Sequence, residues 1–362
     1  MRFIFFVFSV ACFIGCENNQ IRLRFLDEYV IKDSVSFQNK IVGGVSGIDK
    51  YKNMYYLVID DSQEPRVVAC SIPTKNGEIE KVIFNKTIFI NDSLSHTNSK
   101  ELLDLEAIFI DADGNLNLAS EGSIRKNKRP LLFVSDSTGS FIREFKYPEN
   151  LASIKKESFR HNGVFEGSCR SFDSKGFWIS LESPLKADGE EASHKQEKYP
   201  VRITYFNSDS GKAEKQYAYE LEHLENPIKG NLNLNGVTAL IEYRKNEFFI
   251  IERIYQSGYG SYGNTIRIFK ATVSHNTTNT LKLPSLKEAS YVPLKKELLF
   301  DFELIKKELT EGIIDNIEGV CLGDTLTNGN KTLLLVSDDN FQLYGKQLNQ
   351  FILMEIIDGG IK

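Results

Sequence analysis

The chain has 362 residues, of which 41% are hydrophobic and 26% charged, and its formal net charge is −5. This composition is typical of a folded protein with a sizeable core, and it excludes a disordered chain, a collagen-like repeat and a small disulfide-rich scaffold. The acidic balance argues against nucleic acid as a partner, because phosphate backbones are bound by clustered Lys and Arg.

The first sixteen residues have the pattern of a targeting segment. Met1 and Arg2 form a short basic start, residues 3–14 are apolar except for Ser9, and Cys16 is followed at once by polar residues. A run of twelve residues is too short to span a bilayer, and such a run is typical of a secretory signal. Gly15-Cys16 resembles the bacterial lipobox, in which the cysteine is diacylated and becomes the first mature residue. The alternative is a plain signal peptide that is cleaved nearby.

This pattern also predicts a location. Residues 1–15 would be a lipoprotein signal peptide, Cys16 the lipidated residue, and residues 16–24 a tether. A lipid holds a protein at a membrane surface without a spanning helix, and no other segment reaches eighteen apolar residues. We therefore expect secretion across the inner membrane and lipid anchoring in the bacterial cell envelope, at the outer membrane or cell surface.

Three cysteines remain in the mature chain, namely Cys70, Cys169 and Cys321. An odd number allows at most one disulfide, and the spacing fits no metal-binding pattern. We expect them to be buried as small apolar side chains.

Short apolar runs separated by polar turn residues recur along the rest of the chain. Examples are residues 55–59, 131–134, 176–181, 248–251 and 332–336. Such runs predict strands that are buried on both faces. Asp113-Gly114-Asn115 and Ser174-Lys175-Gly176 are typical of hairpin turns. The one helical candidate is residues 303–311.

The strands form a two-strand unit that occurs five times. A small residue opens the first strand of each unit, and an acidic cluster closes the second. The small residues are Gly47, Ala107, Gly167, Ala239 and Gly319. The closing acids follow 13, 14, 15, 13 and 19 positions later, and successive units start 60, 60, 72 and 80 residues apart. An all-strand repeat with this period predicts a β-propeller.

We expect a single all-β domain over residues 25–362, a β-propeller of antiparallel four-stranded blades, with five to seven blades compatible with the repeat. Residues 21–31 and 351–357 could pair as strands, so that the two chain ends share a blade and close the ring. The polar insertions at residues 186–199 and 274–288 are expected to be surface loops.

The geometry of the unit predicts which acids meet. The innermost strands of a propeller surround its central channel, and a hairpin puts the start of its first strand beside the end of its second. Glu106 should therefore lie near Glu121, Glu166 near Glu182, and Glu318 near Asp338, all at the same end of the channel. The small residue at each strand start suits the crowded centre.

Five ordered motifs resemble the bacterial "esterase-like activity of phytase" family. They are residues 42–49 with 56–62, 162–167 with 181–185, 251–253, 316–319 and 336–341. The resemblance runs from about Phe25 to Phe341. It implies a phytase-like propeller domain, six blades as in phytases, and phosphoester hydrolase activity. It carries over no proven catalytic residue.

Carboxylates that converge on one rim repel each other unless cations neutralise them. Ca²⁺ is the expected ion, because it takes six to eight hard oxygen ligands. The candidate metal ligands are Asp60, Asp61, Glu121, Glu318, Asp338 and Asp339. The candidate catalytic residues are Glu166, Glu182, Glu252 and Arg253, the carboxylates as bases and the guanidinium as a phosphate-binding fork. The alternative is that the acids accept hydrogen bonds from backbone N–H groups in tight turns.

These observations leave two classes of function open. The first is a metal-dependent hydrolase of phosphomonoesters or phosphodiesters, a monomer that acts on a small phosphorylated substrate. The second is a non-catalytic propeller that binds a ligand or a protein at the cell surface. A narrower option is a lactonase-like or other calcium-dependent propeller enzyme. The chain has no Gly-x-Ser-x-Gly motif, so the word esterase does not indicate a serine hydrolase here.

Overall fold

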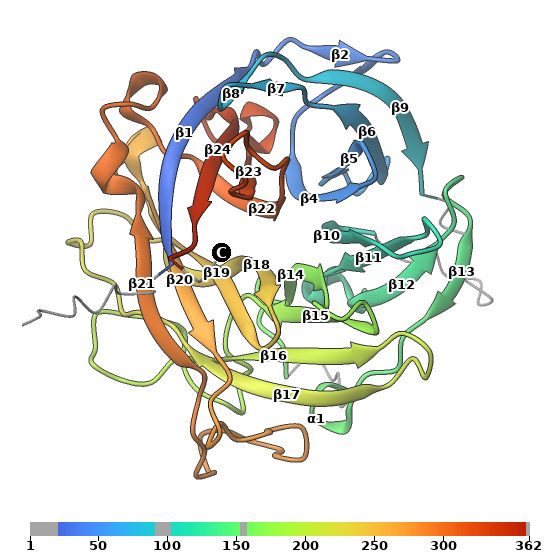
Figure 1. Ribbon diagram of the computed structural model, residues 1–362. Helices are drawn as coiled ribbons and strands as arrows, with labels where there is room; N and C mark the ends of the chain where they lie inside the picture. Colours follow the sequence, from blue (N-terminus) through green and yellow to red (C-terminus); the bar gives the residue numbers. More distant parts are fainter. Residues whose placement is uncertain (1–20, 91–102, 153–157, 360–362) are drawn as a thin grey trace, which may run out of the picture.

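Five four-stranded antiparallel sheets stand around a central axis as the blades of a propeller (Figure 1). The computed structural model describes residues 21–90, 103–152 and 158–359. The predicted all-β propeller with four-stranded blades is confirmed. The number of blades is five, which lies within the expected range but is not the six implied by the resemblance to phytases. Each of the five sequence units is one blade.

Blades 1 to 4 are meanders in which the first strand is innermost. Blade 1 contains β4 (Val45–Tyr51), β5 (Met54–Ile59), β6 (Arg66–Ser71) and β9 (Ile83–Phe89). Blade 2 contains β10 (Leu105–Ile110), β11 (Leu116–Ser120), β12 (Leu131–Ser135) and β13 (Phe141–Glu144). Blade 3 contains β14 (Phe165–Arg170), β15 (Gly176–Leu181), β16 (Pro200–Asn207) and β17 (Ala213–Glu220). Blade 4 contains β18 (Asn233–Arg244), β19 (Glu247–Gln256), β20 (Asn264–Thr272) and β21 (Lys295–Asp301).

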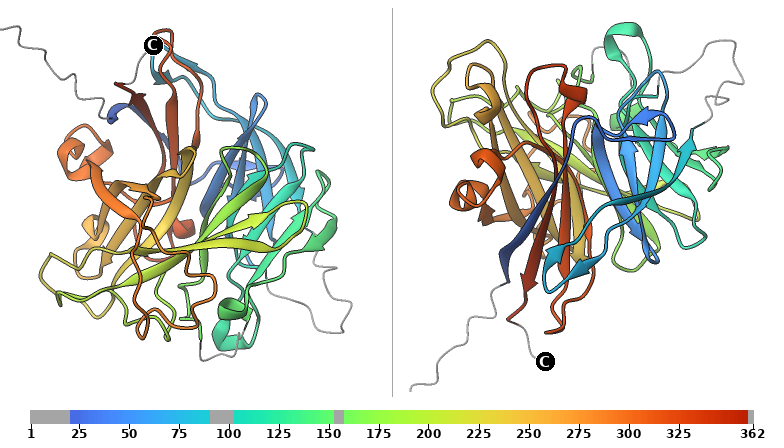
Figure 2. Two further views of the ribbon diagram at one scale, coloured as in Figure 1. Left: turned by 60° about the horizontal axis from the view of Figure 1, so that its bottom comes forward. Right: turned by 90° about the horizontal axis from the view of Figure 1, so that it is seen from above.

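Blade 5 joins the two ends of the described chain and closes the ring. It contains β22 (Asn316–Leu322), β23 (Thr332–Asp338), β24 (Asn349–Ile357) and β1 (Arg22–Ile31), with β1 beside β24 (Figure 2). This is the predicted pairing of the two chain ends. Because β1 begins at Arg22 opposite Ile357, residues 22–24 belong to this strand and not to a tether. The predicted signal peptide and Cys16 lie outside the described residues.

Little other regular structure is present in the described residues. The short ribbons pair β2 (Ser36–Phe37) with β3 (Lys40–Ile41) and β7 (Thr74–Lys75) with β8 (Glu78–Ile79). The helical turns are α1 (Glu149–Ala152), η1 (Ile124–Lys126), η2 (Gly260–Tyr262), η3 (Phe302–Ile305), η4 (Thr310–Gly312) and η5 (Asn340–Gln342). The helical candidate at 303–311 is therefore two separate 3₁₀ turns, because the backbone of Leu309 between them is extended, with φ −84° and ψ 151°. No helix in the described ranges is long and apolar enough to cross a membrane.

The innermost strands β4, β10, β14, β18 and β22 form a closed ring of neighbours. The pairing register shifts near the start of each, which is the mark of a β-bulge. A bulge changes the direction of a side chain and ends regular pairing. The residues at these five shifts are Ser46, Glu106, Glu166, Thr238 and Glu318, which we call the bulge ring.

The small residue after each bulge is required by the close approach of the blades. A Cβ on Gly167 would lie 2.9 Å from the Cα of Ala239 in blade 4. A Cβ on Gly319 would lie 3.0 Å from the backbone nitrogen of Ile48 in blade 1. These contacts are with backbone atoms, which cannot rotate away, so a larger side chain forces the blades apart.

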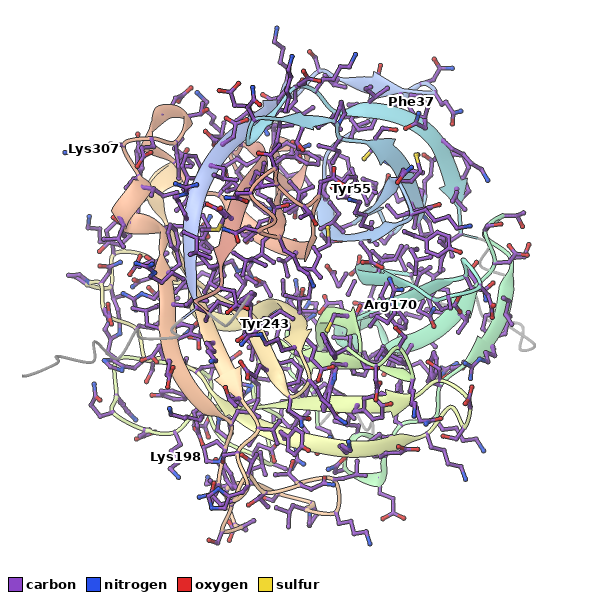
Figure 3. The ribbon with its side chains drawn as sticks, in the orientation of Figure 1. Phe37, Tyr55, Arg170, Lys198, Tyr243 and Lys307 are labelled. Carbon is purple, nitrogen blue, oxygen red and sulfur yellow. The ribbon has the colours of Figure 1, made fainter. Side chains whose placement is uncertain are left out.

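Apolar side chains fill the space between neighbouring blades (Figure 3). Trp178 of blade 3 is buried and packs edge-on against Phe248 of blade 4 with ring centroids 5.0 Å apart. Its indole N–H donates to Glu242 at 2.9 Å, which satisfies the one polar atom of the side chain. The three described cysteines are free and buried, as predicted.

Both predicted hairpin turns are present. The backbone of Asp111 donates to the carbonyl of Asn115 at 3.1 Å, and Gly114 has a φ of +86°. Ser171 donates to the carbonyl of Gly176 at 2.8 Å across the second turn. The polar insertions at 186–199 and 274–288 are loops. They are joined through Arg202, which is fully buried and pairs with Asp188 at 2.6 Å.

We predict that Gly167→Ala lowers the free energy of unfolding by about 1 to 3 kcal/mol, the usual cost of overpacking. The added methyl group meets backbone atoms of blade 4 at 2.9 Å. Urea unfolding of the purified protein measures the change. Gly189→Ala is the matched control, because its nearest neighbour lies at 3.5 Å. Equal effects of the two substitutions would contradict the crowding at the channel.

Candidate functional site

One end of the channel carries a second ring of side chains beside the bulge ring. Each blade contributes the second-strand residue at the same register position relative to its bulge, which is at the end of the second strand in blades 1, 2, 3 and 5 and within the longer β19 in blade 4. By strand register these equivalent residues are Asp60, Glu121, Glu182, Arg253 and Asp338, which we call the strand-end ring. Four blades therefore place an acid in this ring, and blade 4 places an arginine there.

Backbone hydrogen bonds hold the strand-end ring beside the start of each innermost strand. The amide of Asp60 donates to Gly44 at 2.7 Å, and the amide of Glu121 donates to Asp104 at 3.0 Å. The amide of Glu182 likewise donates to the carbonyl of Val164 at 2.8 Å. Each side chain consequently leaves the open end of its hairpin and reaches the bulge ring, as the repeat predicted.

The predicted pairs of acids are neighbours in the structure. Glu121 interacts electrostatically with Glu106, Glu182 with Glu166, and Glu318 with Asp338. In each pair the charge of the first-named carboxylate raises the pKa of the second, after the larger effect of burial. The two-strand unit thus brings its acids to one end of the channel in three blades.

The other two blades place hydroxyl groups in the bulge ring. The Ser46 hydroxyl donates to the carbonyl of Leu105 at 2.7 Å, and the Thr238 hydroxyl donates to the carbonyl of Ile317 at 2.6 Å. Each bond joins a blade to the next one around the ring. Ser46 and Thr238 therefore act as links between blades, and only Glu106, Glu166 and Glu318 supply carboxyl groups at the bulges.

The bulge-ring carboxylates line a small cavity at the channel. Its other walls are the small residues of the innermost strands and apolar side chains that include Ile48 and Leu240. Glu106 and Glu166 are each 8% exposed. Carboxyl groups in such surroundings favour their protonated form, or they require a cation.

Burial, followed by repulsion between like charges, raises the pKa of the acids in both rings. The pKa of Glu121 and that of Glu318 are raised to about 8. Asp60, Glu106, Glu166 and Asp338 have pKa values well above their usual range. Raised pKa values in several neighbouring acids are typical of functional sites.

Arg253 is the positive charge within the two rings. Its Nη2 donates to Glu182 at 2.7 Å, and its Nη1 donates to Glu318 at 2.8 Å and also contacts Asn316. Burial alone would lower the pKa of Arg253, but the carboxylates of Glu182 and Glu318 hold this pKa above its usual value. Both terminal nitrogens are thus bound to the protein itself, so Arg253 differs from the free phosphate-binding fork that we expected.

Asp60, Asp104 and Glu106 form an acidic triad that could hold a metal ion. One carboxylate oxygen of each lies within 4.8 Å of those of the other two. The repeat did not select Asp104, because the unit was counted from the small residue at 107. The sequence pattern that could have identified Asp104 is the alternation Asp104-Leu105-Glu106, since residues two apart on a strand face the same side.

The structure separates three sequence candidates from the rings. Glu252 is 2% exposed and accepts hydrogen bonds from the Tyr219 hydroxyl at 2.6 Å and the Glu222 amide at 3.0 Å. It lies between blades, because adjacent strand residues face opposite sides and Arg253 occupies the channel side. The strand register thus places Arg253, and not the predicted acid, at the equivalent position of the second strand in blade 4.

Asp61 and Asp339 accept hydrogen bonds from backbone N–H groups, as the alternative to a metal-ligand role predicted. Asp61 pairs with Arg66 at 2.7 Å and accepts from the Gln63 amide at 3.1 Å. Asp339 accepts from the Gly44 amide at 2.7 Å and thereby connects blade 5 to blade 1. Their oxygens are used in turns and in closing the ring. Asp338 also accepts a hydrogen bond from a turn amide, that of Asn340 at 2.7 Å, but its register position, like that of Asp60, is in the strand-end ring.

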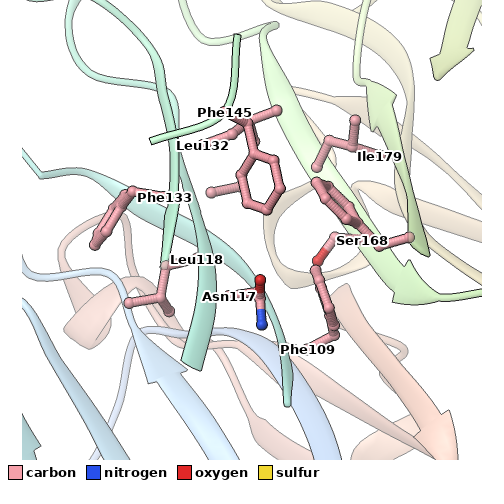
Figure 4. Close-up of a pocket in the computed structure, with 10 residues that line it drawn as sticks. Phe109, Asn117, Leu118, Leu132, Phe133, Phe145, Ser168 and Ile179 are labelled. Atoms are coloured by element: carbon pink, nitrogen blue, oxygen red, sulfur yellow. The ribbon is translucent and has the colours of Figure 1, made fainter. Parts of the chain in front are cut away.

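A second small cavity lies away from the rings (Figure 4). It is lined mainly by apolar side chains of blades 2 and 3, with Asn117 and Ser168 as polar exceptions. The Ser168 hydroxyl is buried without a hydrogen-bond partner. This cavity is a packing gap between two blades, and it has no group of titratable residues in its lining.

The fold and site define a class: a five-bladed propeller with buried carboxyl groups at one end of its channel. The family model described as "Phytase-like: Esterase-like activity of phytase" matches residues 40–341. The chain therefore belongs to the phytase-like family. No curated protein matches it in sequence.

Several solved structures are similar at low identity. The endo-arabinase from Bacteroides thetaiotaomicron is 14% identical, with 89% of this chain and 95% of that chain covered and a TM-score of 0.46. The exo-β-1,3-galactanase from Phanerochaete chrysosporium is 10% identical, with 93% and 64% covered and a TM-score of 0.48. The allergen Mala s 1 from Malassezia sympodialis is 11% identical, with 91% and 82% covered and a TM-score of 0.42.

We predict that the protein, kept in chelator, loses stability as pH rises from 5 to 9. The pKa of Glu318 is about 8 in the folded state against 4.5 as its ordinary value, so folding favours the protonated form. Its contribution is full below pH 4.5 and is lost as pH rises through about 8. Glu318→Gln should reduce the loss of unfolding free energy between pH 5 and 9 by at least about 1.4 kcal/mol, the equivalent of one pKa unit.

Urea unfolding at a series of pH values measures this dependence. Glu190→Gln is the control, because the Glu190 side chain is 73% exposed. The same pH profile for wild type and Glu318→Gln would show that this carboxyl group is not perturbed by folding.

Proposed function

We propose that this protein is a monomeric hydrolase of small phosphoesters, either phosphomonoesters or phosphodiesters, and that it depends on a divalent cation such as Ca²⁺. One observation carries the proposal: eight carboxyl groups and one arginine meet at the channel of a phytase-like propeller. The eight are Asp60, Asp104, Glu106, Glu121, Glu166, Glu182, Glu318 and Asp338. This excess of acids would repel an anionic substrate unless a cation compensates it.

The residues of the acidic triad fit such a cation. Asp60, Asp104 and Glu106 offer hard carboxylate oxygens within 4.8 Å of one another, and Ca²⁺ prefers this type of ligand. A bound cation would supply neutralisation of phosphoryl charge and activation of water.

Two neighbouring carboxyl groups suit acid–base roles. Burial and the charge of Glu182 raise the pKa of Glu166 well above its usual range, so Glu166 holds a proton that it can give to a leaving oxygen. Burial raises the pKa of Glu182, but the charge and the hydrogen bond of Arg253 oppose this rise, so Glu182 gives up its proton more readily than Glu166 and suits the role of a base. Different environments thus separate the roles of two like groups. Arg253 is a positioning residue in this scheme, because its donors hold Glu182 and Glu318.

We predict that the purified protein hydrolyses at least one member of a panel of chromogenic phosphomonoesters and phosphodiesters when Ca²⁺ is present. Chelator should abolish turnover, and added Ca²⁺ should restore it. Glu166→Gln should lower kcat/KM by about 10²-fold or more, the usual contribution of a general acid. Glu190→Gln, on the surface, should retain full activity.

Folded protein that turns over no substrate with any divalent cation would overturn the hydrolase proposal. It would favour the second candidate, a non-catalytic propeller that binds a ligand or a protein at the cell surface. The observation that favours this candidate is that Arg253 already has protein partners on both terminal nitrogens.

We also propose that a lipid on Cys16 anchors the protein in the bacterial cell envelope. The pattern of residues 3–16 supports this proposal. The direction of β1 adds a consequence. Arg22 pairs with Ile357 at one end of blade 5, whereas Ile31 pairs with Asn349 toward the end that carries Asp338. An anchor before β1 would therefore leave the acidic end of the channel facing away from the membrane.

We predict that Cys16→Ser moves the protein from the membrane fraction to the soluble fraction when it is expressed in a bacterium. Diacylation supplies the membrane affinity, and serine cannot be diacylated through a thioether. Cys12→Ser is the control, since Cys12 lies within the apolar run. Wild-type protein found in the soluble fraction would contradict the anchor.

A further inference from the structure

The hairpin of β18 and β19 in blade 4 extends past the two rings at the acidic end, unlike the hairpins of the other blades. In blades 1, 2 and 3 the second strand ends directly before its residue of the strand-end ring, and in blade 5 it ends at that residue. β19 instead continues past Arg253, and β18 begins well before its bulge-ring residue, Thr238. Blade 4 therefore projects beyond the acids by residues 233–236 and 253–256, which we call the blade-4 extension.

One face of the blade-4 extension is covered by the protein itself. The side chain of Asn235 donates to the carbonyl of Glu222 at 2.8 Å, and that of Gln256 donates to the carbonyl of Asn226 at 3.0 Å. Both carbonyls belong to the segment between β17 and β18. This segment therefore lies against the face of the extension that carries Asn235 and Gln256.

The opposite face of the extension borders the site. Because side chains alternate along a strand, this face carries the remaining residues. They form two cross-strand pairs, Gly236 with Arg253 and Leu234 with Tyr255. Arg253 donates to Glu182 at 2.7 Å, and a Cβ on Gly236 would lie 2.4 Å from the Cγ of Glu182. The first pair thus contacts Glu182, the base of the proposed reaction.

The second pair, Leu234 and Tyr255, forms an apolar ledge beyond Glu182. It lies two residues further along the strands, a distance of about 7 Å. Both residues are partly exposed. The Tyr255 hydroxyl makes no hydrogen bond, and the ring makes no aromatic or cation–π contact, with any residue in the described ranges. A Cβ on Gly263 would lie 3.2 Å from the Cε2 of Tyr255, so one edge of the ring rests against this glycine.

The charges of the extension determine what kind of group the ledge can bind. Arg253 is the one charged residue of the extension, and both of its terminal nitrogens already bind Glu182 and Glu318. A second phosphate group would find no free cation on the extension, and nearby carboxylates would repel it. An uncharged ring would instead bury apolar area on Leu234 and pack against the ring of Tyr255, since aromatic rings favour offset-stacked or edge-to-face contacts.

We propose that the apolar ledge binds the alcohol portion of the substrate, and that this portion is an uncharged aromatic ring. The substrates are then phosphoesters of aryl alcohols with a single phosphoryl group, and not polyphosphorylated molecules. With the phosphoryl group beside Glu182, the ring lies toward Tyr255, which is a specificity-determining residue. The catalytic use of the ledge rests on the proposed function, but binding of the ring does not depend on turnover.

Calorimetric titration with two non-hydrolysable probes, benzylphosphonate and methylphosphonate, tests this proposal in the presence of Ca²⁺. In benzylphosphonate a CH₂ group replaces the ester oxygen of an aryl phosphate, whereas methylphosphonate has the same charged group without the ring. We expect wild-type protein to bind benzylphosphonate at least fivefold tighter than methylphosphonate. Tyr255→Ala should remove this difference without weakening methylphosphonate binding, and Tyr255→Phe should keep it because the ring is retained.

Tyr262→Ala is the matched control, because it removes a tyrosine from the neighbouring turn η2. Tyr262 is 53% exposed, and its hydroxyl donates to the carbonyl of Glu311 at 3.4 Å, outside the ledge. Its removal should leave both affinities unchanged. Leu234→Ala removes the other half of the ledge, and it should weaken benzylphosphonate binding at least twofold. Circular dichroism verifies that each variant is folded.

The proposal would be overturned if folded wild-type protein bound both phosphonates equally or bound neither, or if Tyr255→Ala and Tyr262→Ala had the same effect. The result is separable from the hydrolase assay. Selective binding of benzylphosphonate without turnover of any phosphoester leaves the ledge standing and removes the proposed function. Turnover of aryl and alkyl phosphoesters with equal kcat/KM does the reverse.

Discussion

The close approach of five strands at the centre of the ring governs the rest of this structure. The residue after each bulge is glycine or alanine, and at Gly167 and Gly319 even a Cβ would meet the backbone of the next blade. The bulge turns the preceding side chain toward the channel, and the hairpin brings the end of the second strand beside it. Acids that are up to 278 positions apart in the chain, from Asp60 to Asp338, therefore meet at one end of the channel.

This convergence creates an electrostatic problem that shapes the chemistry of the site. Burying like charges together is unfavourable, and the protein answers with protons, with Arg253 and, in our proposal, with Ca²⁺. Elsewhere the same acids would be ordinary surface groups. The energy needed to hold them comes from the apolar contacts between blades and from the shared blade that joins β1 to β24. The stability of the ring thus offsets the unfavourable burial of acids at its centre.

The sequence pattern anticipated much of this arrangement but missed it at specific residues. In blade 4 the repeat selected Glu252, whereas the register places the neighbouring Arg253 at the channel. A shift of one residue moves a strand side chain to the opposite face of the sheet. The distance from the small residue to the closing acid varies from 13 to 19 positions among the units, so spacing alone does not distinguish two adjacent residues. Asp104 was missed because it precedes the small residue from which each unit was counted. Asp61 and Asp339 resembled ligands, but local turns and the contact between blades 5 and 1 use their oxygens.

The sequence by itself determined the fold class, the four-stranded blades, the two-strand unit, and the joining of the chain ends in one blade, because alternating apolar runs and turn residues are local properties of the chain. Only the tertiary structure decided that five blades close the ring, that serine and threonine link blades where glutamates stand in the others, and that Arg253 lies among the acids. These features depend on which strands pair and which residues face each other across the channel. The interactions involved act over long separations in sequence, and no local pattern records them.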